Sequence, residues 1–269
     1  MILDRFRLDG LVTIVTGAGQ GIGRGIAVGL AEAGADVVLA ARTGPDLEEV
    51  AGLVRAAGRR ALVVPTDVMD SDALTRLVDR AGAEFGRIDI LVNNAGGTMP
   101  RPAMQTSERY LDTAFHFNVT APFVLTKLAA QKMVDTAGKG AVVNISARSA
   151  SMTMTCFVAY GAAKAALDRL TRNMAAELAP RVRINVIDVG GVATRSLDFV
   201  LSDDGLREQF VAGTPMRRPG QPEDIACAVV YLASDAASWV TGKVFEIDGG
   251  TDVPAITVPT PPLEPERTK

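Results

Sequence analysis

The sequence has few of the residues that build disulfide frameworks, metal sites or nucleic-acid surfaces. It contains two cysteines, Cys156 and Cys227, and one histidine among 269 residues. Neither cysteine has the close CxxC spacing of metal sites and redox pairs, so we expect two reduced thiols and no metal. The 28 Lys and Arg are outnumbered by 31 Asp and Glu. This balance leaves no broad basic face and predicts that nucleic acid is not a partner.

Long apolar runs are also missing. The first residues, MILDRFRLDG, lack the apolar stretch of a secretion signal, and no run of about 18 apolar residues follows. We therefore expect a cytoplasmic protein that does not use a membrane. Because 48% of the 269 residues are hydrophobic, the chain is long enough to bury a full core as one α/β domain.

Short β-branched runs alternate with longer stretches rich in Ala and Leu. Runs that are apolar on nearly every residue suit strands covered on both faces, and helices between them require parallel crossovers. We predict a single-domain, doubly wound (Rossmann-type) sheet of seven parallel strands with helices on both faces, spanning residues 1–252. Ligands of such sheets collect at the carboxyl ends of the strands. The predicted strands are 11–16, 36–41, 61–66, 88–92, 141–146, 182–188 and 244–247.

The remaining residues, 253–269, differ in composition from the predicted domain. Five prolines follow Thr251, at positions 254, 259, 261, 262 and 265. Proline lacks an N–H group and is excluded from helix interiors and central strands. We expect an extended tail that is either disordered or lies on a neighbouring subunit.

A glycine-rich turn, T-G-A-G-Q-G-I-G, occupies residues 16–23 between the first strand and a helical stretch from Ile22 to Ala33. Glycines let the backbone approach a pyrophosphate, and a helix N-terminus offers free N–H groups with a partial positive charge. A tight turn without a ligand would use the same glycines, but the flanking strand and helix favour a dinucleotide. The predicted contacts are Gly17, Gln20, Gly21, Ile22 and Gly23.

The end of the second strand bears on the choice of nucleotide. NAD enzymes commonly place an acidic residue there, about 20 residues beyond the glycines. This chain has Ala41 followed by Arg42, which leaves room for a 2′-phosphate and supplies a bidentate donor. We predict NADP, with NAD possible; the alternative is that Arg42 is a solvated loop arginine.

Tyr160 and Lys164 form a Y-x-x-x-K pair on a predicted helix. Spacing of four places both side chains on one face, about 5–6 Å apart at Cβ. A neighbouring ammonium and an oxidised nicotinamide favour the phenolate over the phenol, which makes Tyr160 a general acid/base. Together with the glycine turn and Asn93-Asn94-Ala95-Gly96, this pair resembles the short-chain dehydrogenase/reductase family, in its ketoacyl-reductase-like or hydroxysteroid-dehydrogenase-like members, from about Asp9 to Asp252.

The resemblance implies an oxidoreductase that moves a hydride between NADP(H) and the alcohol/ketone pair of a small-molecule substrate. It implies that Tyr160 is the acid/base, that Lys164 also binds the ribose hydroxyls, and that Asn118 holds a water leading to Lys164. It further implies a homotetramer. Additional cofactor contacts are implied for Asp67, Val68, Asn94, Ala95, Gly96, Gly190, Val192 and Thr194.

One departure concerns the family's substrate-binding serine, which lies thirteen residues before the tyrosine. That position is Ala147, and Ser146 should point to the other side of the sheet because strand side chains alternate. The candidates to replace the serine are Ser149, Ser151, Arg148 or the substrate itself. The alternative to a working enzyme is a catalytically impaired relative that binds nucleotide and acts as a sensor or scaffold.

A second departure is Asp188-Val189-Gly190-Gly191 in place of the family's Pro-Gly, so that the backbone at Val189 is less fixed. The segment 194–215 that follows resembles the family's mobile lid.

The loop 152–158, with Met99 and Met104, is apolar and rich in sulfur. Such side chains make adaptable walls for a bulky apolar steroid, terpenoid or acyl substrate. The alternative is that the loop is buried at a subunit contact.

Overall fold

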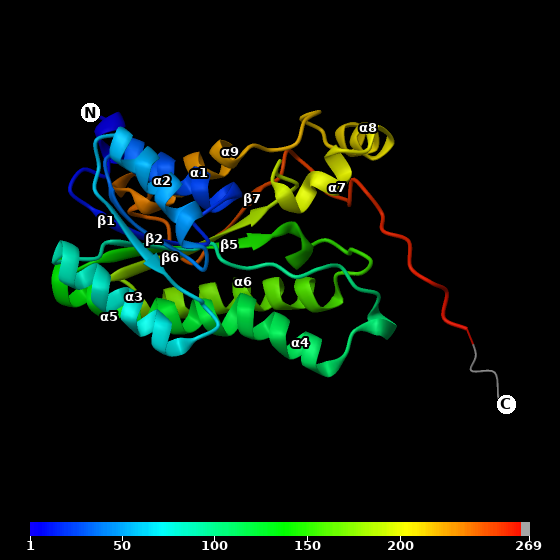
Figure 1. Cartoon of the computed structure of the whole chain (residues 1–269), viewed down its shortest axis with the longest axis horizontal. Coiled ribbons are helices and arrows are strands. Elements are labelled where there is room, and N and C mark those ends of the chain that lie inside the picture. The colour runs from blue at the N-terminus through cyan, green and yellow to red at the C-terminus, as the bar shows by residue number, and fades with distance from the viewer. Residues whose placement is uncertain (265–269) are drawn as a thin grey trace.

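Seven parallel strands form one sheet in the order β3-β2-β1-β4-β5-β6-β7 (Figure 1). The computed structural model describes residues 1–264. The predicted doubly wound sheet is confirmed, and the strand ends differ from the predicted ones by only one or two residues. The strands are β1 Val12–Thr16, β2 Asp36–Ala41, β3 Ala61–Pro65, β4 Ile90–Asn93, β5 Gly140–Ala147, β6 Val182–Val189 and β7 Val244–Ile247.

Helices cover both faces of the sheet. Figure 1 shows α1, α2 and α9 on one face and α3, α5 and α6 on the other, with α7 and α8 near the outer end of the molecule. The helices are α1 Gly21–Glu32, α2 Gly44–Ala56, α3 Ser71–Phe85, α4 Glu108–Phe115, α5 Ala121–Ala137, α6 Val158–Leu178, α7 Asp198–Leu201, α8 Asp204–Gly213 and α9 Pro222–Ala233. Short helical turns are η1 Leu3–Phe6, η2 Ala103–Gln105, η3 His116–Thr120, η4 Arg148–Ala150, η5 Arg195–Leu197 and η6 Asp235–Ala237.

Helix α3 illustrates how the local sequence fixes an element. Its buried residues, including Leu74, Leu77 and Val78, recur every three or four positions and so share one face. The Asp70 side chain accepts a hydrogen bond from an N–H of the first turn, and Gly86 ends the helix with a φ of +75°. Each leucine that this face buries contributes about 1.5–3 kcal/mol to the free energy of unfolding.

The sheet separates two apolar cores. One joins α1, α2 and α9 to the strands through residues such as Leu30 and Val229, and the other joins α3 and α5 through Leu77 and Leu125. No helix within residues 1–264 is long and apolar enough to cross a membrane.

The C-terminal segment contains no helix or strand between Thr251 and residue 264, as its prolines predict. It lies against its own chain at least as far as Val258, whose carbonyl accepts a hydrogen bond of 2.6 Å from the Thr155 hydroxyl. Arg148 donates to the Thr251 carbonyl at 3.2 Å. As far as Val258 the segment is therefore extended, as predicted, and packs on its own chain; a contact with a neighbouring subunit stays a prediction. Residues 265–269 lie outside the described part.

Candidate active site

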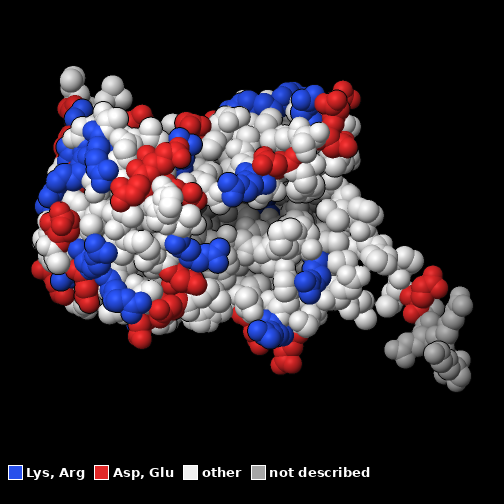
Figure 2. All heavy atoms as spheres, viewed as in Figure 1, with Lys and Arg blue, Asp and Glu red and all other residues white. Residues whose placement is uncertain are grey.

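A cavity of about 2260 Å³ opens at the carboxyl ends of the strands. It lies where the chain order reverses between β1 and β4, which is the ligand-binding position of doubly wound sheets. In Figure 2 a hollow is visible at the centre of this face, with basic side chains at its margin. The predicted site residues from the glycine turn, the loop after β4 and helix α6 all contribute to its wall, so the fold brings them together.

The glycine turn is so close to its neighbours that side chains are excluded. A Cβ at Gly23 would lie 2.1 Å from the Gly17 carbonyl oxygen, and one at Gly17 would lie 2.8 Å from Asn94 Nδ2. Gly17 and Gly21 have φ values of +64° and +53°, which favour glycine. Gln20 gives α1 no side-chain cap, so the N–H groups of the first turn face the cavity without one.

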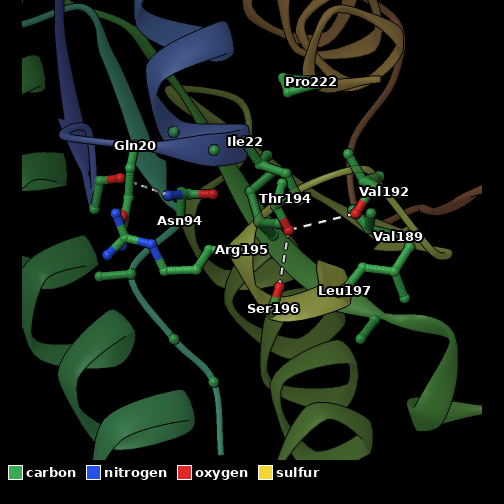
Figure 3. A pocket seen from close by; sticks show the side chains of 18 of the residues that line it. Gln20, Ile22, Asn94, Val189, Val192, Thr194, Arg195, Ser196, Leu197 and Pro222 are labelled. Carbon is green, nitrogen blue, oxygen red and sulfur yellow. Dashed lines mark hydrogen bonds between the residues drawn. The ribbon is translucent and has the colours of Figure 1, made fainter. Parts of the chain in front are cut away.

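The loop after β4 is fixed to this turn by hydrogen bonds. Asn94 Nδ2 donates to the Thr16 carbonyl at 2.9 Å. It also donates to the Gly17 carbonyl at 3.3 Å (Figure 3). The Thr16 hydroxyl accepts from the backbone N–H groups of Asn94 and Ala95, both at 3.0 Å. This role of Thr16 was not predicted, although the threonine begins the glycine motif. The two segments form one continuous floor.

Arg42, Asp67 and Val68 stand at the ends of β2 and β3 and line the cavity. Arg42 is exposed, and within residues 1–264 its guanidinium takes part in no ion pair. Asp67 accepts a hydrogen bond of 3.0 Å from the Met69 N–H, which fixes its carboxylate at the strand end. This edge therefore presents one cation and one anion to a ligand.

The opposite wall comes from the segment after β6. The Thr194 hydroxyl bonds to the Val192 carbonyl at 3.3 Å and shares a hydrogen bond of 2.8 Å with Ser196 (Figure 3). A Cβ at Gly190 would lie 2.6 Å from the Asp248 Cα, so a side chain there is excluded. Val189 pairs with Ile247 of β7, so β6 continues to this residue. A proline at this position would have no backbone N–H to donate.

Tyr160 and Lys164 project from the first turns of α6 into the cavity wall. Lys164 Nζ lies 5.6 Å from the centre of the Tyr160 ring, and it donates a hydrogen bond of 2.9 Å to the Ile145 carbonyl. Burial lowers the pKa of Lys164 to about 8, against the opposing effect of Asp168 and Asp188. The helix thus brings the predicted pair together on one face.

The expected phenolate depends on the lysine together with an oxidised nicotinamide, and it stays a prediction. In the chain by itself, burial raises the pKa of Tyr160 to about 12, and the nearby Asp188 carboxyl adds to the rise. The spacing of four residues correctly placed the cation, but spacing does not show that the phenol is buried. Tyr160 is therefore a protonated phenol at neutral pH.

Asn118 lies in the π-helical turn η3 between α4 and α5. Its Oδ1 accepts from the Gly97 N–H at 3.0 Å, and its Nδ2 donates to the Ala114 carbonyl at 2.9 Å. A Cβ at Gly96 would lie 2.9 Å from Asn118 Oδ1 and 3.1 Å from Lys164 Nζ. Both polar groups thus border the small space that Gly96 leaves open.

The end of β5 distinguishes between the candidates to replace the serine missing at Ala147. Arg148 is buried, forms ion pairs with Glu246 and with Asp248 (2.7 Å), and donates to Ser151 Oγ at 3.0 Å. Arg148 and Ser151 are therefore occupied. Ser149 lines the cavity, and its hydroxyl is buried and has no hydrogen-bond partner in the described part of the chain.

Ser146 lies on the other side of β5, as the alternation of strand side chains predicts. Its hydroxyl donates a long hydrogen bond of 3.5 Å to the Lys164 carbonyl and lies close to the carboxyls of Asp168 and Asp188. These two buried carboxyls were missed by the sequence analysis.

The wall beyond Tyr160 is apolar. Met99, Met152, Met154 and Phe157 line it, so the sulfur-rich loop faces the cavity of its own chain. Met104 does not line the cavity and is exposed, which corrects its predicted place in the wall. Side chains from α7 and from the C-terminal segment complete this wall, among them Phe199, Val200, Pro254, Ile256 and Val258. Nothing in the proline pattern indicated that the C-terminal segment would contribute.

Comparison with known proteins gives consistent results along nearly the whole chain. A family described as enoyl-(acyl carrier protein) reductase matches residues 17–252. An uncharacterized oxidoreductase of Mycobacterium tuberculosis is 47% identical over 98% of this chain and 100% of its own length. The 7alpha-hydroxysteroid dehydrogenase of Escherichia coli K12 is 37% identical over 92% of this chain and 96% of its own. A solved 7alpha-hydroxysteroid dehydrogenase complexed with NADH and 7-oxo glycochenodeoxycholic acid superposes with a TM-score of 0.89, at 36% identity, over 93% of this chain and 97% of that one.

Proposed function

Since this chain belongs to the short-chain dehydrogenase/reductase family and is a nicotinamide-dependent oxidoreductase acting on CH–OH groups, we propose that it uses NADP(H) and a bulky, apolar alcohol/ketone pair. One observation carries the proposal: the Tyr160–Lys164 pair lies where the glycine-lined part of the cavity meets its apolar part. A hydride donor on one side and a carbonyl carbon on the other would both reach that point.

The residues present fit a dinucleotide. Gly17 and Gly23 leave backbone where side chains would collide, and the uncapped start of α1 favours a pyrophosphate. Lys164 and Asn94 would contribute at the ribose end, and Gly190, Val192 and Thr194 at the nicotinamide end. When bound, the cofactor supplies or accepts the hydride. The exposed, unpaired Arg42 at the end of β2 supports NADP(H), because a guanidinium binds a 2′-phosphate in bidentate fashion.

Tyr160 handles the proton of the reaction. With a pKa of about 12 the phenol is protonated at neutral pH, so it donates its proton to the carbonyl oxygen during reduction. In oxidation the phenolate must form first, so we expect the oxidation rate to rise with pH. The charged Lys164, 5.6 Å from the ring centre, stabilises that phenolate.

Ser149 is the residue that we propose at the reacting oxygen in place of the missing serine. The residue belongs to the cavity wall, and its hydroxyl is buried and has no partner within residues 1–264. Its backbone also contacts the turn that holds Tyr160, since a Cβ at Gly161 would lie 2.7 Å from the Ser149 carbonyl oxygen. A buried hydroxyl without a partner is costly, and a substrate oxygen would supply the missing hydrogen bond. Nothing in the site favours the impaired alternative over a working enzyme.

The substrate proposal depends on the apolar wall. Methionine side chains adapt to irregular apolar ligands, and Met99, Met152 and Met154 all contribute. The solved relative contains 7-oxo glycochenodeoxycholic acid, which is a bulky alicyclic ketone. We therefore propose a steroid or another polycyclic ketone, with acyl and terpenoid ketones as the alternatives to screen.

The test is a spectrophotometric screen of ketones and secondary alcohols, including 7-oxo and 7-hydroxy bile acids, with NADPH and NADH. We expect turnover by the wild type and a loss of about 10²–10⁴-fold in kcat for Tyr160→Phe. Tyr231→Phe, on α9 and outside the cavity wall, is the matched control and should leave kcat unchanged. A wild-type kcat in Tyr160→Phe would overturn the mechanism. Cofactor binding by the wild type without turnover of any compound would favour the alternative of a catalytically impaired relative that acts as a sensor or scaffold.

A further inference from the structure

A cluster of buried charged groups lies behind Lys164. Asp168 follows Lys164 by one turn of α6, and Asp188 lies on β6, opposite Ser146 of β5 in the sheet register. The exposed fractions are 9% for Asp168 and 1% for Asp188, and Lys164 is exposed by only 3%. Two carboxyls at such depth are rare unless they are paired. The proton transfer by Tyr160 does not use either of them.

The hydrogen bonds available to the two carboxyls do not suffice if both are ionised. Both oxygens of Asp188 and Oδ1 of Asp168 are buried, and none makes a well-formed hydrogen bond within residues 1–264. The Ser146 hydroxyl lies close to both carboxyls and 3.5 Å from the Lys164 carbonyl oxygen, and its single proton can serve only one of these acceptors. An ionised carboxylate only accepts, so two of them cannot satisfy each other. If one is protonated, its O–H becomes the donor that the other lacks.

The surrounding charges act in opposite directions. Lys164, Arg172 and Arg148 lower the pKa of the carboxyls, whereas Glu246 raises that of Asp188. Besides Lys164, the charged groups acting on the pair are Arg172 on α6, Arg148 in η4 and Glu246 on β7, and Tyr160 is the remaining titratable neighbour. Arg148 is already paired with Glu246 and Asp248. Burial raises the pKa of both aspartates, and that of Asp188 reaches about 7, with Asp168 adding to the rise.

We propose that Asp168 and Asp188 share one proton at neutral pH and form a singly charged pair that keeps Lys164 in its cationic state beside Tyr160. Asp168 and Asp188 are positioning residues in this scheme, because they act through Lys164. Burial alone drives the lysine towards its neutral form, and the single negative charge offsets that tendency. The catalytic consequence rests on the proposed function; the shared proton does not.

The pair also makes the active site sensitive to pH. When the shared proton leaves, the charge of the pair changes from −1 to −2. The second negative charge raises the Tyr160 pKa further and so opposes the phenolate that oxidation needs. The oxidation rate should therefore rise less steeply above about pH 7 than it would with a neutral residue at position 188.

Infrared titration of the purified full chain tests the shared proton without any substrate. At about pH 6 ordinary carboxyls are ionised, so a carbonyl-stretch band of a protonated carboxyl reports a raised pKa. We expect such a band in the wild type, disappearing as the pH rises through about 7. It should be lost in Asp188→Asn, in which the amide replaces the protonated acid without changing its shape. Asp79→Asn, on the exposed side of α3, is the matched control and should retain the band.

The absence of this band in the wild type, or its persistence in both Asp188→Asn and Asp168→Asn, would overturn the shared proton. The positioning role is tested by the pH profile of kcat for alcohol oxidation. In this profile kcat rises with pH as Tyr160 loses its proton. Asp188→Asn should shift this rise to lower pH by about one unit, because a negative charge near the phenol is removed.

A profile that superimposes on the wild type would overturn the positioning role. If the wild type oxidises no alcohol at all, the proposed function fails, whereas the infrared result still decides whether the proton is shared.

Discussion

The two halves of the cavity are built by different means. Around β1 and β4, backbone packs against backbone, as Gly23 does against Gly17, and one side chain, Asn94, donates to the Thr16 carbonyl. Around β5, β6 and β7, side chains hold the structure, and Arg148 joins Glu246 and Asp248 far along the sequence. The first half agrees with the family's glycine and NNAG motifs, and the second departs from the family pattern at Ala147 and Val189. Contact between backbones leaves few alternatives, whereas contacts between side chains can be rebuilt.

Changing the backbone-packed half should have the largest effect. In Gly23→Ala the new methyl group would lie 2.1 Å from the Gly17 carbonyl oxygen, and the turn must move to admit it. We expect a penalty of about 4 kcal/mol in cofactor binding, about 1000-fold in Kd, measured by fluorescence titration with NADPH. Gly52→Ala is the control, since nothing lies within 4 Å of that position on α2, and its Kd should not change. Normal affinity in Gly23→Ala would show that the turn can adapt after all.

The rebuilt half should respond less, and in a way that can be reversed. Removing the unpartnered hydroxyl in Ser149→Ala should lower kcat about 100-fold if it contacts the reacting oxygen. Adding Ala147→Ser to this variant should recover part of the loss, because it restores the family's serine at the end of β5. Steady-state kinetics on the best ketone of the screen measures both. An unchanged kcat/KM in Ser149→Ala would exclude Ser149 as the residue that binds the reacting oxygen. The difference between the two halves would then have no effect on catalysis.

The smallest effect is expected at the edge of the first half, where Arg42 is exposed. Arg42→Asp should weaken NADPH binding relative to NADH by about tenfold, because a charge-assisted hydrogen bond is lost and repulsion takes its place. Equilibrium titration with both cofactors measures the ratio, and Arg80→Ala on α3 serves as the control for a surface arginine. An unchanged ratio would mean that Arg42 is a solvated loop residue and that NADP(H) is not the favoured cofactor.

The contrast between the halves also explains what could be predicted from the sequence. The seven strands follow from apolar runs, and the glycine turn and the Tyr160–Lys164 pair follow from short spacings within one segment. The ion pairs of Arg148 join residues about a hundred positions apart, and no local pattern indicates them. Burial is equally invisible to spacing. For this reason the effect of burial on the Tyr160 pKa was not foreseen and the Asp168–Asp188 pair was missed.

The C-terminal segment has a practical consequence for work with this enzyme. Pro254, Ile256 and Val258 form part of the apolar wall of the cavity. An affinity tag or reporter fused at the C-terminus would therefore be attached directly to a segment that lines the substrate-binding part of the cavity. The N-terminal turn η1 is exposed and lies at the opposite end of the molecule (Figure 1). Expression vectors that carry the tag before Met1 therefore keep the added residues away from the C-terminal segment, although Phe6 of η1 also lines the cavity.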